Sequence, residues 1–169
     1  MVRFVDRLVQ DGIDAPVDLI VDPNERDLVD IRHKRLSHHW WAALRKRGGL
    51  PRRSEIGEPF LAEIADHTVI LSRQGDDFRY EKFGRALART YGIDMTGKLL
   101  GDYPGPVATL FRWIYHTCEI KRVPLYSRHM SATAAPVDHW LRLIVPLDQK
   151  GGGQATHLLG CSIAVKNGQ

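Results

Sequence analysis

The clearest structural signal in the chain is a pair of short apolar runs joined by a tight turn, residues 67–83, with the sequence HTVILSRQGDDFRYEKF. The first run, His67–Ser72, is rich in aliphatic and β-branched residues, as in a buried strand. Gly-Asp-Asp at 75–77 is typical of a turn, and Phe78–Phe83 alternates large apolar with charged side chains. The stretch therefore predicts a β-hairpin.

The rest of the chain continues with helices and then strands. The expected elements are helices at 57–66, 84–91, 96–102 and 104–122 and strands at 124–132, 137–147 and 158–165. The longest helix is indicated by one tight apolar stripe that includes Leu110, Phe111 and Ile114. The order β-β-α-α-α-β-β-β predicts an α+β fold, a five-stranded antiparallel sheet with helices on one face.

An arm and a helix are expected in front of this domain, which we place at 50–169. Residues 1–26 hold short apolar clusters broken by Gly12, Pro16 and Pro23, so they predict an arm with one or two short extended or helical pieces. Residues 27–49 predict an amphipathic basic helix that ends at two glycines. We expect a homodimer to use its apolar stripe, which includes Val29, Leu36, Trp40 and Leu44.

Charge is distributed unevenly along a chain whose net charge is +4. Residues 1–30 carry eight acids and three bases, whereas residues 31–53 carry eight bases and no acid. The pattern predicts either an acidic arm folded over a basic helix or a patch that binds a polyanion. We favour the first, because the opposite charges are adjacent in sequence. The patch would consist of Arg32, Arg35, Arg45, Arg47, Arg52 and Arg53.

Composition indicates a protein of the cytoplasm. The two cysteines, Cys118 and Cys161, are too few for a disulfide framework. No apolar run approaches the roughly 20 residues that a membrane-spanning helix needs. The N-terminus also lacks the apolar stretch and cleavage site of a signal peptide.

No enzyme activity and no metal site are expected. No residues combine a nucleophile, a base and oxyanion donors. His116 and Cys118 point to different sides of their predicted helix, and the neighbours His38 and His39 diverge, so neither pair predicts a shared metal. Haem is not expected, because His116 lies opposite the apolar stripe, and the motif of a flavin–cysteine adduct is missing.

Four segments resemble a known family. They are the helix with Trp40 and Trp41, Leu50–Pro59, Asp77–Gly84 and Gly92–Gly97. Together with the element order they resemble PAS domains of the bacterial PAS_5 family, over residues 36 to 147. The chain departs from that family at Glu81, where arginine is usual, and at Arg85, where threonine is usual. The resemblance implies a sensory or interaction domain and no particular cofactor.

The resemblance also implies where a ligand would bind. In PAS folds the inner face of the sheet and the helix before it line the ligand cavity. With the strand alternation that we assume, the lining is Phe111, Ile114, Tyr115, His129, Leu141 and Leu143. A slip of one residue would bring in Tyr126, Arg128, Met130, Trp140 and Arg142.

Two functions from different classes are therefore expected. The first is a PAS sensor that binds a small ligand, forms a homodimer and passes its signal to a separate signalling protein. The second is a basic module that binds nucleic acid or a cyclic dinucleotide through the arginine patch, with a strong dependence on salt. We favour the first, because no motif for reading nucleic-acid sequence is present.

Overall fold

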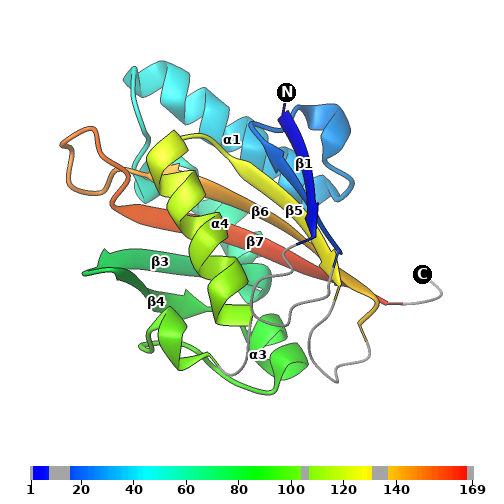
Figure 1. Ribbon diagram of the computed structural model, residues 1–169. Coiled ribbons are helices and arrows are strands. Elements are labelled where there is room, and N and C mark those ends of the chain that lie inside the picture. Colours follow the sequence, from blue (N-terminus) through cyan, green and yellow to red (C-terminus); the bar gives the residue numbers. More distant parts are fainter. Residues whose placement is uncertain (1, 8–15, 104–106, 131–136, 167–169) are drawn as a thin grey trace.

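The computed structural model describes residues 2–7, 16–103, 107–130 and 137–166, and a single antiparallel sheet forms its centre (Figure 1). Seven strands lie in the order β1-β2-β5-β6-β7-β3-β4. Their bounds are β1 Val2–Arg7, β2 Pro16–Val21, β3 Thr68–Gln74, β4 Asp77–Phe83, β5 Leu125–Met130, β6 His139–Leu147 and β7 His157–Val165. The predicted α+β class and the hairpin, now β3–β4, are confirmed.

The helices begin and end where local signals favour it. They are α1 Ile31–Arg47, α2 Glu58–Glu63, α3 Arg85–Tyr91 and α4 Val107–Lys121, with single 3-10 turns η1 Glu25–Asp27, η2 Arg53–Glu55, η3 Ala65–His67 and η4 Leu100–Asp102. Asp30 caps α1, because its carboxylate accepts a hydrogen bond from the backbone N–H of Arg32 at 2.8 Å. Gly48 ends α1 in the left-handed conformation, with φ 73°.

The sheet has seven strands, so the predicted number of five is wrong. The five expected strands are β3 to β7, and the arm adds β1 and β2 beside them. β2 pairs with β5 with Leu19 opposite Ser127, so the arm covers an edge that would otherwise expose unpaired backbone groups. Residues 8–15 of the predicted arm lie outside the described residues.

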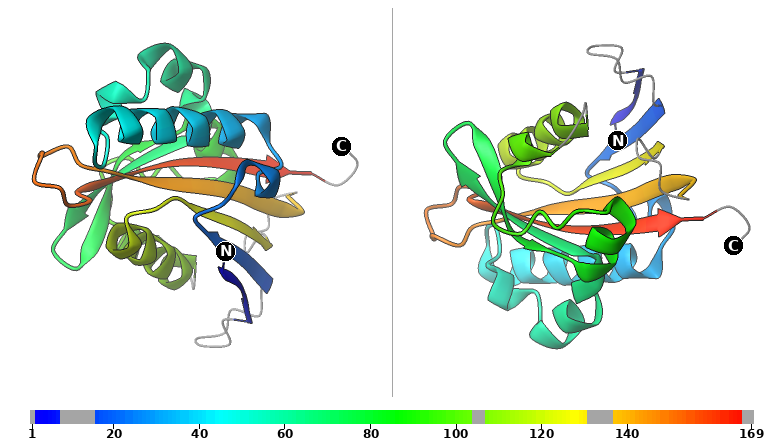
Figure 2. Two further views of the ribbon diagram at one scale, coloured as in Figure 1. Left: turned by 90° about the horizontal axis from the view of Figure 1, so that it is seen from above. Right: turned by 90° about the horizontal axis from the view of Figure 1, so that it is seen from below.

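The helices between β4 and β5, α3 and α4, cover one face of the sheet as predicted, and the helix in front of the domain, α1, covers the other. Figure 2 shows α1 on one side of the sheet and α4 on the other. The reason is the burial of β6, where every residue from Trp140 to Leu147 is buried. A strand that is apolar on both faces needs a cover on both faces.

Each face has its own core. The α1-side core includes Leu36, Trp40, Leu50, Ile56, Phe60, Leu141, Leu143, Val145, Leu159 and Cys161. The α4-side core includes Phe78, Tyr80, Tyr103, Phe111, Ile114, Tyr115, Cys118, Leu125, Trp140 and Ile144.

The segments that carry the family resemblance shape the fold. In Leu50–Pro59 the carbonyl of Pro51 accepts a hydrogen bond from the N–H of Asp148 at 3.0 Å, which ties this segment to the end of β6. Gly97 donates its N–H to the carbonyl of Tyr80 at 2.7 Å and so lines the outer edge of β4. Gly84 lies so close to the backbone of Asp66 that a Cβ would collide with it.

Candidate functional site

The most unusual side chain of the described structure is Arg142, in the middle of β6. It is only 3 % exposed. Its Nε donates to Ser162 Oγ at 2.8 Å, and its terminal nitrogens lie 3.4 Å from the hydroxyl of Tyr115 and 3.3 Å from that of Tyr91. The guanidinium stacks over Phe111, with Cζ 3.8 Å from the ring centroid.

Arg142 has no counter-ion within the residues that the structure describes. All of its hydrogen bonds there go to neutral hydroxyls, and no Asp or Glu whose side chain the structure describes forms an ion pair with it. The acids whose side chains are not described are Asp6, Asp11 and Asp14. A buried charge without an opposite charge is costly, so this arginine calls for an explanation.

Other buried polar atoms around Arg142 also lack partners in the described part of the chain. They are the hydroxyls of Tyr103 and Ser127, both ring nitrogens of His129 and Nε1 of Trp140. The rings pack together, since Phe111 is edge-on to His129 at 5.6 Å and Tyr91 stacks on Trp140 at 4.5 Å. We call Tyr91, Tyr103, Phe111, Tyr115, Ser127, His129, Trp140, Arg142 and Ser162 the Arg142 cluster.

Strand register brings this cluster together. On neighbouring strands Ser127, Arg142 and Ser162 are directly opposite one another, so their side chains form a row across β5, β6 and β7. The next row along β5 and β6 pairs His129 with Trp140. Tyr91 comes from the end of α3, and Phe111 and Tyr115 come from α4, which closes the cluster from above.

At neutral pH the Arg142 cluster carries one positive charge. Burial, helped by the charge of Arg142, holds the pKa of His129 well below its usual value, so its ring is neutral. Burial raises the pKa of Tyr91 and of Tyr103, so both hydroxyls remain protonated. Burial lowers the pKa of Arg142, but the surrounding tyrosines, Tyr115 foremost, more than offset this and leave it above its ordinary value.

The predicted cavity lining divides between the two cores. Phe111, Ile114, Tyr115 and His129 lie together on the α4 side. Leu141 and Leu143 belong to the α1-side core, so their placement beside the other four is wrong. On β6 the side chains that face α4 are those of the alternative alternation, shifted by one residue, and they include Trp140 and Arg142. On β5 the alternation is the predicted one, with Ser127 and His129 on the α4 side.

The predicted dimer stripe is mostly interior. Leu36 and Trp40 are both 0 % exposed, and Trp40 donates its indole N–H to the carbonyl of Pro146 at 2.8 Å. They pack on the sheet of the same chain, so their assignment to a dimer surface is wrong. Leu44 is half-buried against the same core, whereas Val29 lies before α1 and is exposed.

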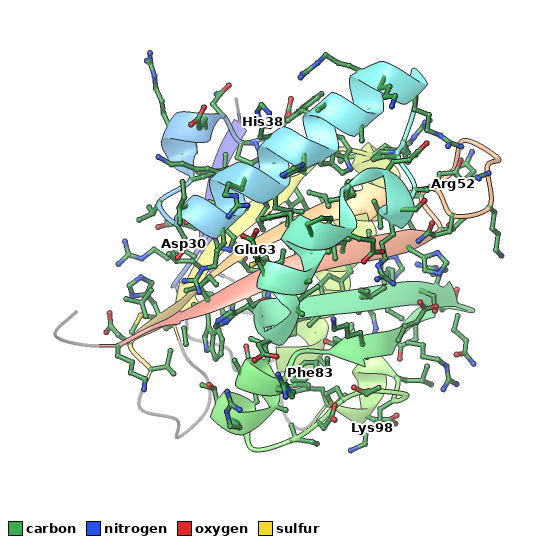
Figure 3. The ribbon with its side chains drawn as sticks, turned by 180° about the vertical axis from the view of Figure 1, so that it is seen from behind. Asp30, His38, Arg52, Glu63, Phe83 and Lys98 are labelled. Carbon is green, nitrogen blue, oxygen red and sulfur yellow. The ribbon has the colours of Figure 1, made fainter. Side chains whose placement is uncertain are left out.

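Most of the arginine patch is compensated within the chain. Figure 3 shows this face, with Asp30 at the start of α1, Glu63 on α2 and Arg52 beyond the end of α1. Ion pairs join Arg32 to Asp30, Arg35 to Glu63, Arg47 to Glu55 and Arg53 to Glu58, at 2.7, 2.6, 3.2 and 3.3 Å. Of these acids only Asp30 belongs to the acidic stretch 1–30, and the other three follow the basic helix at positions 55–63. Of the arm, Asp22 and Glu25 line a surface hollow beside Arg45.

Two further findings bear on function. The described residues contain no group of three or more His, Cys, Asp or Glu side chains placed to bind a metal ion. Within the same part of the chain, none of the helices combines the length and the apolar character needed to cross a membrane.

Comparison with known proteins gives no assignment, because the chain matches no protein-family model and no curated protein.

Proposed function

We propose that this protein is a sensory domain with a PAS-like fold that binds a small molecule in the Arg142 cluster and signals to a separate protein. The observation that carries the proposal is Arg142 itself, a buried guanidinium without a counter-ion among the described residues. Buried hydrogen-bonding groups without partners call for an explanation, and a bound small molecule accounts for several of them at one place.

The topology supports the PAS-like part of the proposal. The five strands from β3 onward lie in the order β4-β3-β7-β6-β5. The chain between β4 and β5 crosses one face of the sheet as α3, η4 and α4. The Arg142 cluster lies between that crossover and the sheet, where the PAS resemblance implies a ligand.

A ligand there could change the outer surface of the domain. Contacts to Arg142 would link α3, through Tyr91, with α4, through Tyr115. α4 exposes apolar side chains on its outer face, with Trp113 41 % and Ile120 75 % exposed. A shift of α4 against the sheet would therefore alter a surface that a partner protein can contact.

The alternative of a polyanion-binding module has less support. Four of the six patch arginines already form ion pairs with acids of the same chain. Arg45 and Arg52 remain without an ion pair in the described structure. A DNA or cyclic-dinucleotide titration of the variant Arg45→Ala/Arg52→Ala distinguishes the two functions, because only the alternative predicts weaker binding.

The proposal is tested by native mass spectrometry of freshly purified protein, with collisional release of bound molecules. The wild type should carry a small mass, and Arg142→Met should lose it. Arg128→Met is the matched control, because this arginine lies on the adjacent strand and is exposed, so its loss should leave the bound mass in place. The proposal fails if the wild type carries no small molecule and no compound from a metabolite library raises its Tm.

A further inference from the structure

We infer that the ligand of the Arg142 cluster is a small organic acid with a single carboxylate, bound to the guanidinium of Arg142. The inference rests on the proposed function and names the class of ligand. It follows from the charge of the cluster, from its hydrogen-bonding groups and from the aromatic rings around Arg142.

Charge comes first. The cluster holds one guanidinium and neutral side chains, and the described residues supply no carboxylate to Arg142. A ligand with one negative charge would neutralise this site, whereas a phosphate dianion would leave one negative charge buried and unpaired. The cluster therefore favours a monoanion.

Hydrogen bonding points to the same ligand. Arg142 has five N–H donors and uses three of them, and all three acceptors are hydroxyls. The hydroxyl of Tyr115 also shares a hydrogen bond with that of Tyr80 at 3.3 Å, whereas the hydrogens of Ser162 and Tyr91 are available as donors. The unpartnered groups nearby add the hydroxyls of Tyr103 and Ser127, the indole N–H of Trp140, and one N–H and one acceptor nitrogen of the neutral His129 ring. Hydroxyls both donate and accept, so the N–H groups of Arg142, Trp140 and His129 outnumber the one nitrogen that only accepts, and an ionised carboxylate offers two oxygens that only accept.

The aromatic rings packed around Arg142 indicate what the rest of the acid is like. Phe111 lies under the guanidinium, and the stacked pair Tyr91 and Trp140 lies beside it. Flat aromatic surfaces bind apolar or aromatic groups better than polar ones. The carboxylate should therefore carry an apolar or aromatic substituent and no second charge.

Calorimetry and thermal unfolding with chemically matched probes test the carboxylate. Benzoate should bind and raise the Tm of the wild type, whereas benzamide, its uncharged counterpart, and inorganic phosphate should not. Arg142→Met should weaken the binding of benzoate by about 30-fold or more, because a buried charge pair loses one partner. Arg128→Met should bind benzoate like the wild type.

A second variant tests the same inference without any ligand. Ser127 lies directly opposite Arg142, so Ser127→Asp places a carboxylate within reach of the guanidinium. Ser127→Asn is the control of equal size without charge. The aspartate variant should unfold at least about 3 °C above the asparagine variant and should no longer respond to benzoate.

Each outcome has one meaning. Equal binding of benzamide and benzoate, or a Ser127→Asp variant less stable than Ser127→Asn, overturns the carboxylate while the proposed function stands. The acids whose side chains the structure does not describe are Asp6, Asp11 and Asp14, so Asp6→Asn/Asp11→Asn/Asp14→Asn must also bind benzoate like the wild type. If this triple variant instead unfolds early and binds no benzoate, the counter-ion belongs to the chain and the inference is overturned.

Discussion

The two faces of the sheet are covered by helices of similar length, α1 with 17 residues and α4 with 15, yet they bury different chemistry. The α1 side is mainly aliphatic, and its buried histidine, His33, has a ring nitrogen 3.1 Å from the carbonyl oxygen of Cys161. The α4 side buries an arginine without a counter-ion in the described structure and five unpartnered polar atoms, against two on the α1 side, Nδ1 of His33 and the hydroxyl of Tyr126. Apolar packing stabilises more than an incompletely satisfied polar cluster does. We therefore assign stability to the α1 side and binding to the α4 side.

The largest effect on stability is expected from Trp40→Ala on the α1 side. The side chain is fully buried, and its truncation leaves a cavity and an unpaired carbonyl at Pro146. We expect a loss of about 3–5 kcal/mol in the free energy of unfolding, measured with urea. Trp113→Ala, at a site that is 41 % exposed, is the control and should cost far less. A change of oligomeric state without loss of stability would contradict this assignment.

Acid should weaken the α1 side through His33. Burial lowers the pKa of His33 from 6.5 to about 4, against a smaller opposing effect of Asp30. The unfolded chain therefore binds a proton between these pH values that the folded chain does not, so stability falls as the pH drops from 6.5 toward 4. The contribution of His33 is about 3 kcal/mol. His33→Gln should flatten this part of a pH series of urea unfolding curves, with His38→Gln as the exposed control. An unchanged slope in His33→Gln would refute the assignment.

A smaller loss is expected from Gly160→Ala on β7. A Cβ at this position would collide with the side chains of Ile144 and Val69, which pack on the α4 side. Overpacking of this kind costs about 1–3 kcal/mol. Gly152→Ala, at an exposed position where a Cβ meets nothing within 4 Å, is the control in the same thermal unfolding assay. Equal Tm values for the two variants would show that the contact around Gly160 relaxes freely.

The sequence predicted the elements better than their arrangement. The hairpin, α1 and α4 followed from local periodicity, turn residues and the helix-ending Gly48, and all three are present. The pairing of β2 with β5 was missed, because an edge strand is defined by its neighbour and its own sequence carries little signal.

The site was half predicted, and the reason lies in β6. Its residues are buried on both faces, so no polar face fixes which side chains point toward α4. Arg142 was the available signal, because a lone charged residue in the middle of such a strand needs a partner or a function. The alternation that was assumed placed it away from α4.

The most direct test of the difference between the two faces is the stability of Arg142→Met after unfolding and refolding in urea, which removes bound small molecules. If Arg142 serves binding, the free energy of unfolding should stay within about 1 kcal/mol of the wild type or rise, because an apolar side chain of similar length replaces an uncompensated charge. A loss as large as that expected for Trp40→Ala would contradict the account, since Arg142 would then be part of the structural core.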